Sequence, residues 1–118
     1  MLYFYNMLAM RRSARQELVF KALADYRRRE ILDMLKEEPR TTGELCGRFP
    51  NLDRCTVMQH IHVLEKADLI IIKREGRLRW NYLNAVPIRE IYNRWIGEYA
   101  SDAVELLTRM KSSIEGTK

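Results

Sequence analysis

The sequence has few of the residues that mark disulfide scaffolds, zinc sites or membrane spans. Its 118 residues include two cysteines, two histidines, five glycines and three prolines. Cys46 and Cys55 lie near each other, on segments that we expect to be neighbouring helices, so they do not form a disulfide framework and a reducing cytoplasm is expected. A membrane span needs roughly 20 apolar residues, and no uninterrupted run of that length occurs. We expect no membrane partner.

The motifs of the common enzyme classes are also lacking. There is no glycine-rich phosphate loop, no combination of nucleophile, histidine and acid, and no cluster of carboxylates suited to a metal. The sequence therefore predicts a protein that is not an enzyme and that needs no cofactor.

What the chain does have is an excess of positive charge. It contains 21 Lys and Arg against 16 Asp and Glu, a formal net charge of +5. Such an excess favours a polyanionic partner but does not identify one. The length allows one domain with a modest core.

The first 13 residues form an extension before the recognisable helical pattern. They are mostly apolar as far as Met10, and Arg11 and Arg12 follow. A signal peptide places its basic residues before the apolar run rather than after it. Two interpretations stay open for residues 1–13: an extra amphipathic helix at a dimer interface, or a disordered extension.

Spacing and capping residues predict four helices before any strand. Apolar spacing indicates a helix over about 14–25, and Asp25 suits the N-cap of a second helix over about 27–38. The segment TTGE at 41–44 matches a capping box, in which a Thr hydroxyl and a Glu carboxylate satisfy each other's backbone donors, and it begins a short helix. Asp53 suits the cap of the next helix, over about 54–67.

The helix predicted over 54–67 has two different faces. At 100° per residue, one arc is apolar and belongs to the core; it holds Val57, His60, Ile61 and Leu64. We expect His60 to be a buried, hydrogen-bonded histidine. The opposite arc holds Cys55, Met58, Gln59, His62 and Lys66. Its small, polar and adaptable side chains suit the edges of DNA bases.

Two strands and a basic turn follow that helix. The apolar run 69–72 predicts a strand covered on more than one side, and residues 77–83 alternate as a strand does. We expect Gly76 to have a positive φ in the turn. The alternation predicts Leu78, Trp80 and Tyr82 facing inward, and Arg77, Arg79 and Asn81 facing outward. Helix, strand, basic turn and strand are typical of a winged helix-turn-helix.

A long amphipathic helix is predicted over about 88–114. About 27 residues would span ~40 Å, more than a domain this small needs for its own core. Its stripe either packs against a second copy of the chain or folds back over the core. The residues expected at such a dimer interface are Ile88, Ile91, Tyr92, Trp95, Ile96, Tyr99, Ala103, Leu106 and Met110.

Several dispersed segments resemble one family. They are 18–25 (LVFKALAD), 28–32 (RREIL), Glu44-Leu45, His60, 64–67 (LEKA), 74–77 (REGR) and the stretch from Trp95 to Tyr99. Together they resemble the ArsR-type winged helix-turn-helix transcriptional regulators. The resemblance implies a mainly α fold with a small β-hairpin and a long C-terminal dimerisation helix. It also implies a homodimer that binds double-stranded operator DNA, usually as a repressor, with the helix 54–67 in the major groove. The expected parts are an N-terminal extension (1–13), a DNA-binding core (14–86) and a dimerisation helix (87–118).

The chain departs from the family pattern at a few positions. Tyr26 and Arg27 stand where the family usually has Pro-Thr, and Met58 stands where serine is common. Met58 therefore leaves the target sequence open. Asp68 replaces a glycine, but Asp tolerates the left-handed conformation that ends a helix.

Metal sensing is not expected. Metal-sensing members resemble one another in a Glu-Leu-Cys-x-Cys segment, whereas here Arg48 occupies the place of the second cysteine after Cys46. The C-terminal site of zinc sensors needs histidines, and none follows His62. A redox role stays open for Cys55, because the helix N-terminus and Arg54 would favour its thiolate.

The arginine run at 27–29 has two interpretations. It serves solubility alone, or, as the family suggests, Arg28 supports the helix-turn-helix while Arg27 contacts a phosphate.

These patterns lead to one set of predicted DNA contacts. They come from the short helix, the helix 54–67 and the basic turn: Thr42, Arg54, Cys55, Thr56, Met58, Gln59, His62, Arg74, Gly76, Arg77 and Arg79. A winged-helix module that binds RNA or a protein partner is the alternative, since fold alone does not fix function. Whether a small molecule or a redox signal acts as effector stays open.

Overall fold

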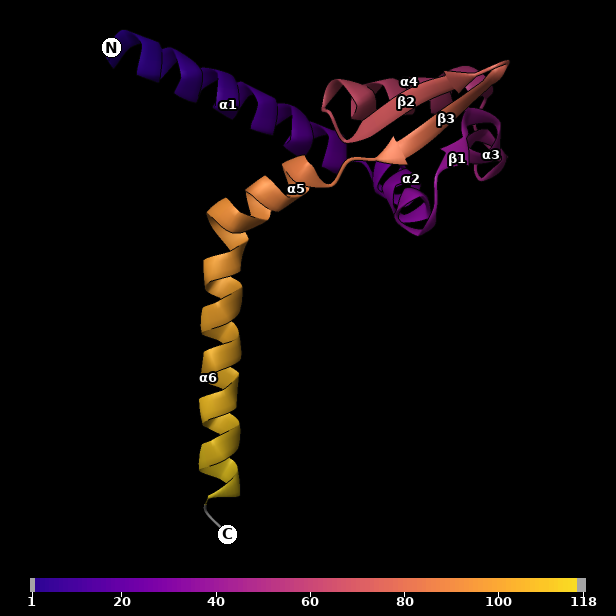
Figure 1. Ribbon diagram of the computed structural model, residues 1–118. Helices are drawn as coiled ribbons and strands as arrows, with labels where there is room; N and C mark the ends of the chain where they lie inside the picture. The colour runs from indigo at the N-terminus through magenta and orange to yellow at the C-terminus, as the bar shows by residue number, and fades with distance from the viewer. Residues whose placement is uncertain (1, 117–118) are drawn as a thin grey trace. The chain divides into compact units, whose positions relative to one another are not determined.

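The computed structural model describes residues 2–116, drawn in Figure 1. The elements are α1 (Leu2–Leu23), α2 (Tyr26–Glu37), β1 (Arg40–Thr41), α3 (Thr42–Gly47), α4 (Arg54–Lys66), β2 (Ile70–Glu75), β3 (Leu78–Leu83), α5 (Val86–Ile91), the π-helix η1 (Tyr92–Ile96) and α6 (Gly97–Glu115). The chain divides into two compact units between Pro87 and Ile88. Each unit is described by itself.

The first unit is a winged helix-turn-helix, the fold class predicted from the sequence. Its core is built from the C-terminal part of α1, from α2, α3 and α4, and from the start of β2. The most buried apolar side chains are Val19, Ala22, Ile31, Leu35, Leu45, Val57, Ile61, Leu64, Leu69 and Ile70. The predicted inner face of α4 is confirmed, because all four of its expected core residues are buried.

Three helices begin at the predicted caps. The Asp25 carboxylate accepts a hydrogen bond from the Arg27 backbone N–H (2.8 Å), and the Asp53 carboxylate accepts one from the Thr56 N–H (2.7 Å). The Thr41 hydroxyl accepts one from the Glu44 N–H (3.2 Å). Only this half of the predicted capping box forms within residues 2–116. The Glu44 carboxylate turns instead to Arg40, with Oε2 lying 3.7 Å from Nη1.

One guanidinium joins three helices of the first unit. Arg28, on α2, donates from Nε to the Ala22 carbonyl (2.8 Å) and from Nη2 to the Lys21 carbonyl (2.9 Å), both at the end of α1. Its Nη1 lies 3.1 Å from Nδ1 of His60 on α4. Because arginine can only donate, Nδ1 accepts and the neutral ring carries its proton on Nε2. Burial lowers the pKa of His60 and so favours this neutral form. Of the two interpretations of the arginine run, these contacts favour scaffold support by Arg28. The expectation that His60 is a buried, hydrogen-bonded histidine is confirmed.

The neighbouring Arg27 is held by its own helix cap. Its Nε and Nη2 donate to the two carboxylate oxygens of Asp25, over 3.1 and 2.9 Å. The side-chain hydrogen bonds and the charge of Arg27 hold the pKa of the Asp25 carboxyl well below its usual range. The phosphate contact suggested for Arg27 would have to compete with this bidentate pair.

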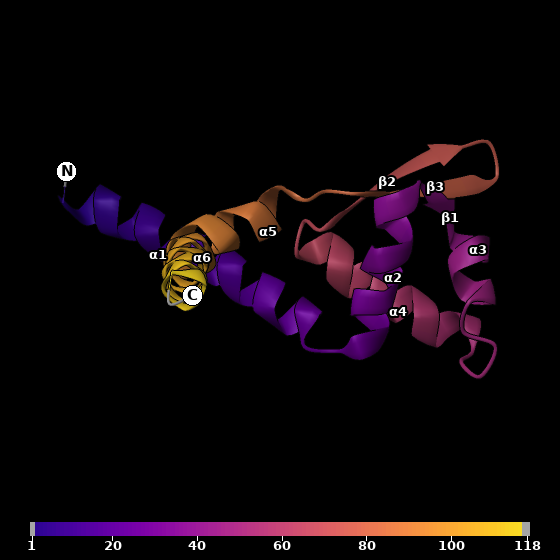
Figure 2. The same ribbon diagram turned by 90° about the horizontal axis from the view of Figure 1, so that it is seen from below.

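The sheet has three antiparallel strands in the order β1-β3-β2, and Figure 2 shows the β2–β3 hairpin from a second side. The short β1 was not predicted. It pairs Arg40 with Asn81, and Asn81 pairs in turn with Ile72 of β2. Left-handed residues lie at the expected places: Gly76 in the turn has φ +60°, and Asp68 after α4 has φ +63°.

The predicted orientation of β3 is wrong. Asn81, expected to face outward, is completely buried, whereas Leu78, expected inward, is 51% exposed. The Asn81 amide donates to the Arg40 carbonyl (3.1 Å) and the Thr42 hydroxyl (3.2 Å). These acceptors belong to β1 and α3, so the unpredicted strand is what turns the amide inward. The expectation that residues 69–72 are covered on more than one side also fails at Ile71, which is 52% exposed.

The N-terminal extension is helical and continuous with the first core helix. α1 runs without a break from Leu2 to Leu23, so no boundary occurs at residue 13 and the disordered alternative does not hold for residues 2–13. Before Gln16 the side chains are exposed apart from a half-buried Met7. No helix of the described residues is long and apolar enough to cross a membrane.

The C-terminal pattern forms three segments rather than the single helix predicted. α5 passes into η1 at Tyr92, and α6 begins at Gly97, whose N–H bonds to the Tyr92 carbonyl five residues earlier. That i to i−5 bond defines the π-turn. A Cβ on Gly97 would lie 3.1 Å from Cε1 of Tyr92, so the ring packs where a larger residue would crowd it. The sequence did not predict this π-turn. It adds one residue to a single helical turn, and the apolar spacing continues before and after it.

We predict that Arg28→Ala lowers the free energy of unfolding by about 2–3 kcal/mol, because three contacts of a charged group are removed and the Ala22 carbonyl loses this donor, whereas the Lys21 carbonyl keeps the Ala24 N–H. Urea denaturation followed by circular dichroism measures the change. Arg29→Ala is the matched control. Arg29 donates to one exposed carbonyl, that of Leu23, and its removal should lower stability by less than about 1 kcal/mol. Equal effects of the two variants would contradict a special role for Arg28.

Candidate nucleic-acid interface

The outer face of α4 is accessible to a partner. Cys55, Gln59, His62 and Lys66 are exposed, and Met58 is half-buried. This is the arc that the sequence assigned to DNA. Arg54, in the first turn of α4, is also exposed, whereas Thr56 is half-buried.

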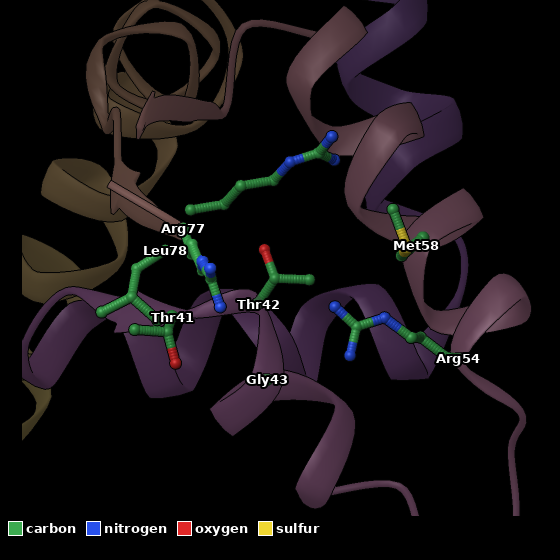
Figure 3. A pocket seen from close by; sticks show the side chains of 8 residues that line it. Thr41, Thr42, Gly43, Arg54, Met58, Arg77 and Leu78 are labelled. Carbon is green, nitrogen blue, oxygen red and sulfur yellow. The ribbon is translucent and has the colours of Figure 1, made fainter. Parts of the chain in front are cut away.

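A groove of about 410 Å³ lies between this helix and the wing. Its residues come from three elements that are distant in sequence. They are Thr41, Thr42 and Gly43 at the start of α3, Arg54 and Met58 on α4, and Arg77, Leu78 and Arg79 at the wing. Figure 3 shows the long side chains of Arg54 and Arg77 on opposite sides of Thr42. The fold therefore brings together residues that the sequence predicted as one surface.

The charge of this groove has one sign. Arg54, Arg77 and Arg79 line it, and no acidic residue is among its lining residues. Arg74 adds a fourth cation, because β2 pairs it directly with Arg79 of β3. Like charges directly opposite each other destabilise a strand pair. A phosphate group bound nearby would relieve that repulsion, so the arrangement suits a polyanion.

Thr42 lies on the floor of the groove rather than at its rim. The side chain is buried, and its hydroxyl accepts the hydrogen bond from the Asn81 amide. Asn81 itself was not predicted as a functional residue. Through Arg40 and Thr42 it ties the base of the wing to the start of α3. The sequence did contain one indication of this role, because Asn81 is the only amide side chain in the strand 78–83.

A second hollow follows the outer face of α4. It has a volume of about 610 Å³, and Cys55, Met58, Gln59, His62 and Val63 line it. Val63 was not among the predicted contacts. The ring of His62 lies close to the end of the helix, with Nδ1 3.9 Å from Oε1 of Glu65. Met58 lines both this hollow and the groove beside the wing.

The position where metal-sensing relatives carry a second cysteine is occupied by an ion pair. Arg48 Nε donates to Glu30 Oε1 over 3.0 Å, joining α3 to α2. Cys46 is half-buried and Cys55 is exposed, and neither forms a disulfide. Across residues 2–116, no three side chains of His, Cys, Asp or Glu gather in a way that could hold a metal ion.

Comparison with known proteins places the chain among DNA-binding regulators. A family model described as a helix-turn-helix domain matches residues 23–72. Those residues extend from the end of α1 into β2 and so include both helices of the motif. The chain is 33% identical over 75 residues to the transcriptional repressor SdpR of Bacillus subtilis, a match that covers 64% of this chain and 82% of SdpR.

Two further relatives agree in fold and class. An uncharacterised HTH-type transcriptional regulator of B. subtilis, YuzN, is 36% identical over 87 residues, covering 69% of this chain and 95% of YuzN. The crystal structure of an ArsR family transcriptional regulator superposes with a TM-score of 0.64 at 28% identity, covering 81% of this chain and 93% of that one. These relatives are regulators rather than enzymes. The chain belongs to the ArsR-type winged helix-turn-helix transcriptional regulators, which bind DNA.

Proposed function

We propose that the protein is a homodimeric repressor that binds a palindromic operator through α4 and the β2–β3 wing. The observation that carries this proposal is the groove in which Arg54, Arg77 and Arg79 meet the outer face of α4. A helix of this kind enters the major groove, and a basic wing contacts the flanking backbone. In a symmetric dimer the two helices would lie about one duplex turn apart, so half-sites are expected ~10 base pairs apart or at a multiple of that spacing.

Dimerisation is supported by the apolar surface of the second unit. Tyr92, Trp95, Ile96, Tyr99, Leu106 and Met110 are all exposed, as is Ala103. Large contiguous apolar patches on a protein surface mark interaction sites. Ile88 is half-buried, and Ile91 is buried within the single chain. Ile91 is therefore removed from the proposed interface, while Leu107 and Ile114, both exposed, extend the stripe on α6.

Repression is supported by similarity to SdpR, which is described as a transcriptional repressor. A repressor needs no enzymatic site, only occupancy of DNA that a polymerase must use. Binding of RNA or of a protein partner by the same face is the alternative. The three arginines of the wing, Arg74, Arg77 and Arg79, together with Arg54 on α4, favour a nucleic acid over a protein.

Gln59 is expected to read one base pair in each half-site. It is exposed in the middle of α4, and a glutamine amide can bond bidentately to adenine. Gln59→Ala should reduce discrimination at that position by about 1–3 kcal/mol while binding to scrambled DNA stays unchanged. Fluorescence anisotropy with specific and scrambled duplexes provides the measurement. Unchanged specificity would exclude Gln59 as a base contact.

Arg77 and Arg79 are expected to bind phosphates or a narrow minor groove. Replacing either with alanine should weaken binding to all duplexes and reduce the salt slope by about one unit for each phosphate that a subunit no longer neutralises. A titration across a salt series measures the slope. Lys36→Ala is the control, because Lys36 is an exposed cation of α2 that pairs with Asp33 outside the groove. If the control and the wing variants lower the slope equally, the wing is not the contact surface.

The stripe on α6 is expected to hold the dimer together. Leu106→Glu places a charge among apolar side chains and should give a monomer that binds the operator far more weakly. Ser112→Glu is the matched control: both residues are exposed on α6, but Ser112 lies about 120° or more from every residue of the stripe on α6, including Leu107 and Ile114. Sedimentation velocity at micromolar concentration distinguishes the two. A wild-type monomer, or dissociation by both variants alike, argues against this interface.

A further inference from the structure

The outer face of α4 carries no charged side chain between Arg54 and Glu65. The hollow along it is lined by Cys55, Met58, Gln59, His62 and Val63. Resting on the proposed function, we infer that α4 reads A·T base pairs. In this arrangement Met58 and Val63 pack against thymine methyl groups, and Gln59 bonds to adenine.

The inference follows from what each base presents in the major groove. Guanine offers two acceptors, which arginine or lysine matches best, and cytosine offers a donor, which aspartate or glutamate matches. Adenine offers an acceptor beside a donor, the pattern of a glutamine amide, and thymine adds a methyl group that attracts apolar side chains. The middle of α4 supplies an amide and apolar groups. It supplies neither the cation for guanine nor the carboxylate for cytosine.

The three reading residues are placed to act on neighbouring base pairs. Met58 is half-buried, so part of its thioether side chain is held by the protein while part lines the hollow. A flexible, polarisable methionine adapts well to a methyl group. Gln59 follows directly, and Val63 lies one turn further along the same face, at i+4 from Gln59.

The cations that could have selected guanine lie at the two ends of α4 rather than in its middle, Arg54 in the first turn and Lys66 in the last. Arg54 lines the groove with Arg77 and Arg79, where a phosphate is the expected ligand. The ring of His62 faces Glu65 at the end of the helix. The wing adds a preference of its own, because arginines inserted into a minor groove favour the narrow groove of A·T tracts.

Selection from a library of random-sequence duplexes with the full chain is the first test. We expect A·T pairs at the centre of each selected half-site. The selected duplex is then compared with the same duplex carrying uracil in place of thymine, which removes only the methyl groups. Wild-type affinity should fall about fourfold for each contacted methyl, the fold-change that corresponds to ~0.8 kcal/mol for one buried carbon.

Variants assign the effect to one side chain. Met58→Ala should abolish the difference between the thymine and uracil duplexes at the position that Met58 contacts, whereas Met58→Leu, which keeps an apolar side chain of similar volume, should retain it. Met34→Ala is the control, because Met34 is equally half-buried but lies on α2, in a separate hollow with Glu30 and Arg48. The Met34→Ala variant should discriminate between the thymine and uracil duplexes as the wild type does.

Two results would overturn the inference in distinguishable ways. Half-sites centred on G·C pairs, or equal wild-type affinity for the thymine and uracil duplexes, would refute A·T reading and leave operator binding intact. Failure to select any duplex above scrambled DNA would refute the proposed function, and the inference with it.

Discussion

The arrangement of the DNA-binding unit depends on the guanidinium of Arg28. It satisfies two carbonyls at the end of α1 and binds the neutral ring of His60 on α4, while its own backbone belongs to α2. Three helices are thereby joined through one planar group with fixed donor directions, a role that the point charge of lysine cannot fill. Because His60 lies on the inner side of α4, this contact also fixes which side of the helix faces outward. The orientation of Gln59 and Met58 follows from it.

Asn81 has the corresponding role for the wing. Its buried amide joins β3 to the Arg40 carbonyl and the Thr42 hydroxyl, so Arg77 and Arg79 extend from a strand that is tied to the start of α3. Arg28 sets the direction of the reading helix, and Asn81 sets the position of the wing beside it. A groove with cations from both elements requires the two constraints together. Neither residue touches the proposed DNA, yet both position the residues that would.

Local rules were enough to predict most of the first unit from the sequence. The caps at Asp25, Thr41 and Asp53, the buried arc of α4, and the left-handed Gly76 and Asp68 each depend on residues close together in the chain. The errors arose where distant residues decide the outcome. Asn81 faces inward because its two hydrogen-bond acceptors lie about 40 positions earlier in the sequence. One of them belongs to β1, a two-residue strand that no sequence pattern predicted. The surface residues of the groove were predicted as one set, but the burial of Thr42 beneath Asn81 was not.

Two features of this protein depart from the usual rules of protein stability, and they indicate what its partners are. Arg28 and His60 satisfy each other between the helices, yet Arg74 is paired directly with Arg79 across the hairpin, and α6 leaves Leu106 and Met110 in water. Both departures weaken the isolated chain. A phosphate backbone would relieve the first, and a second copy of the helix would relieve the second. Since natural sequences tolerate such conflicts mainly at functional sites, the wing and the C-terminal stripe are where binding should recover stability that folding alone does not provide.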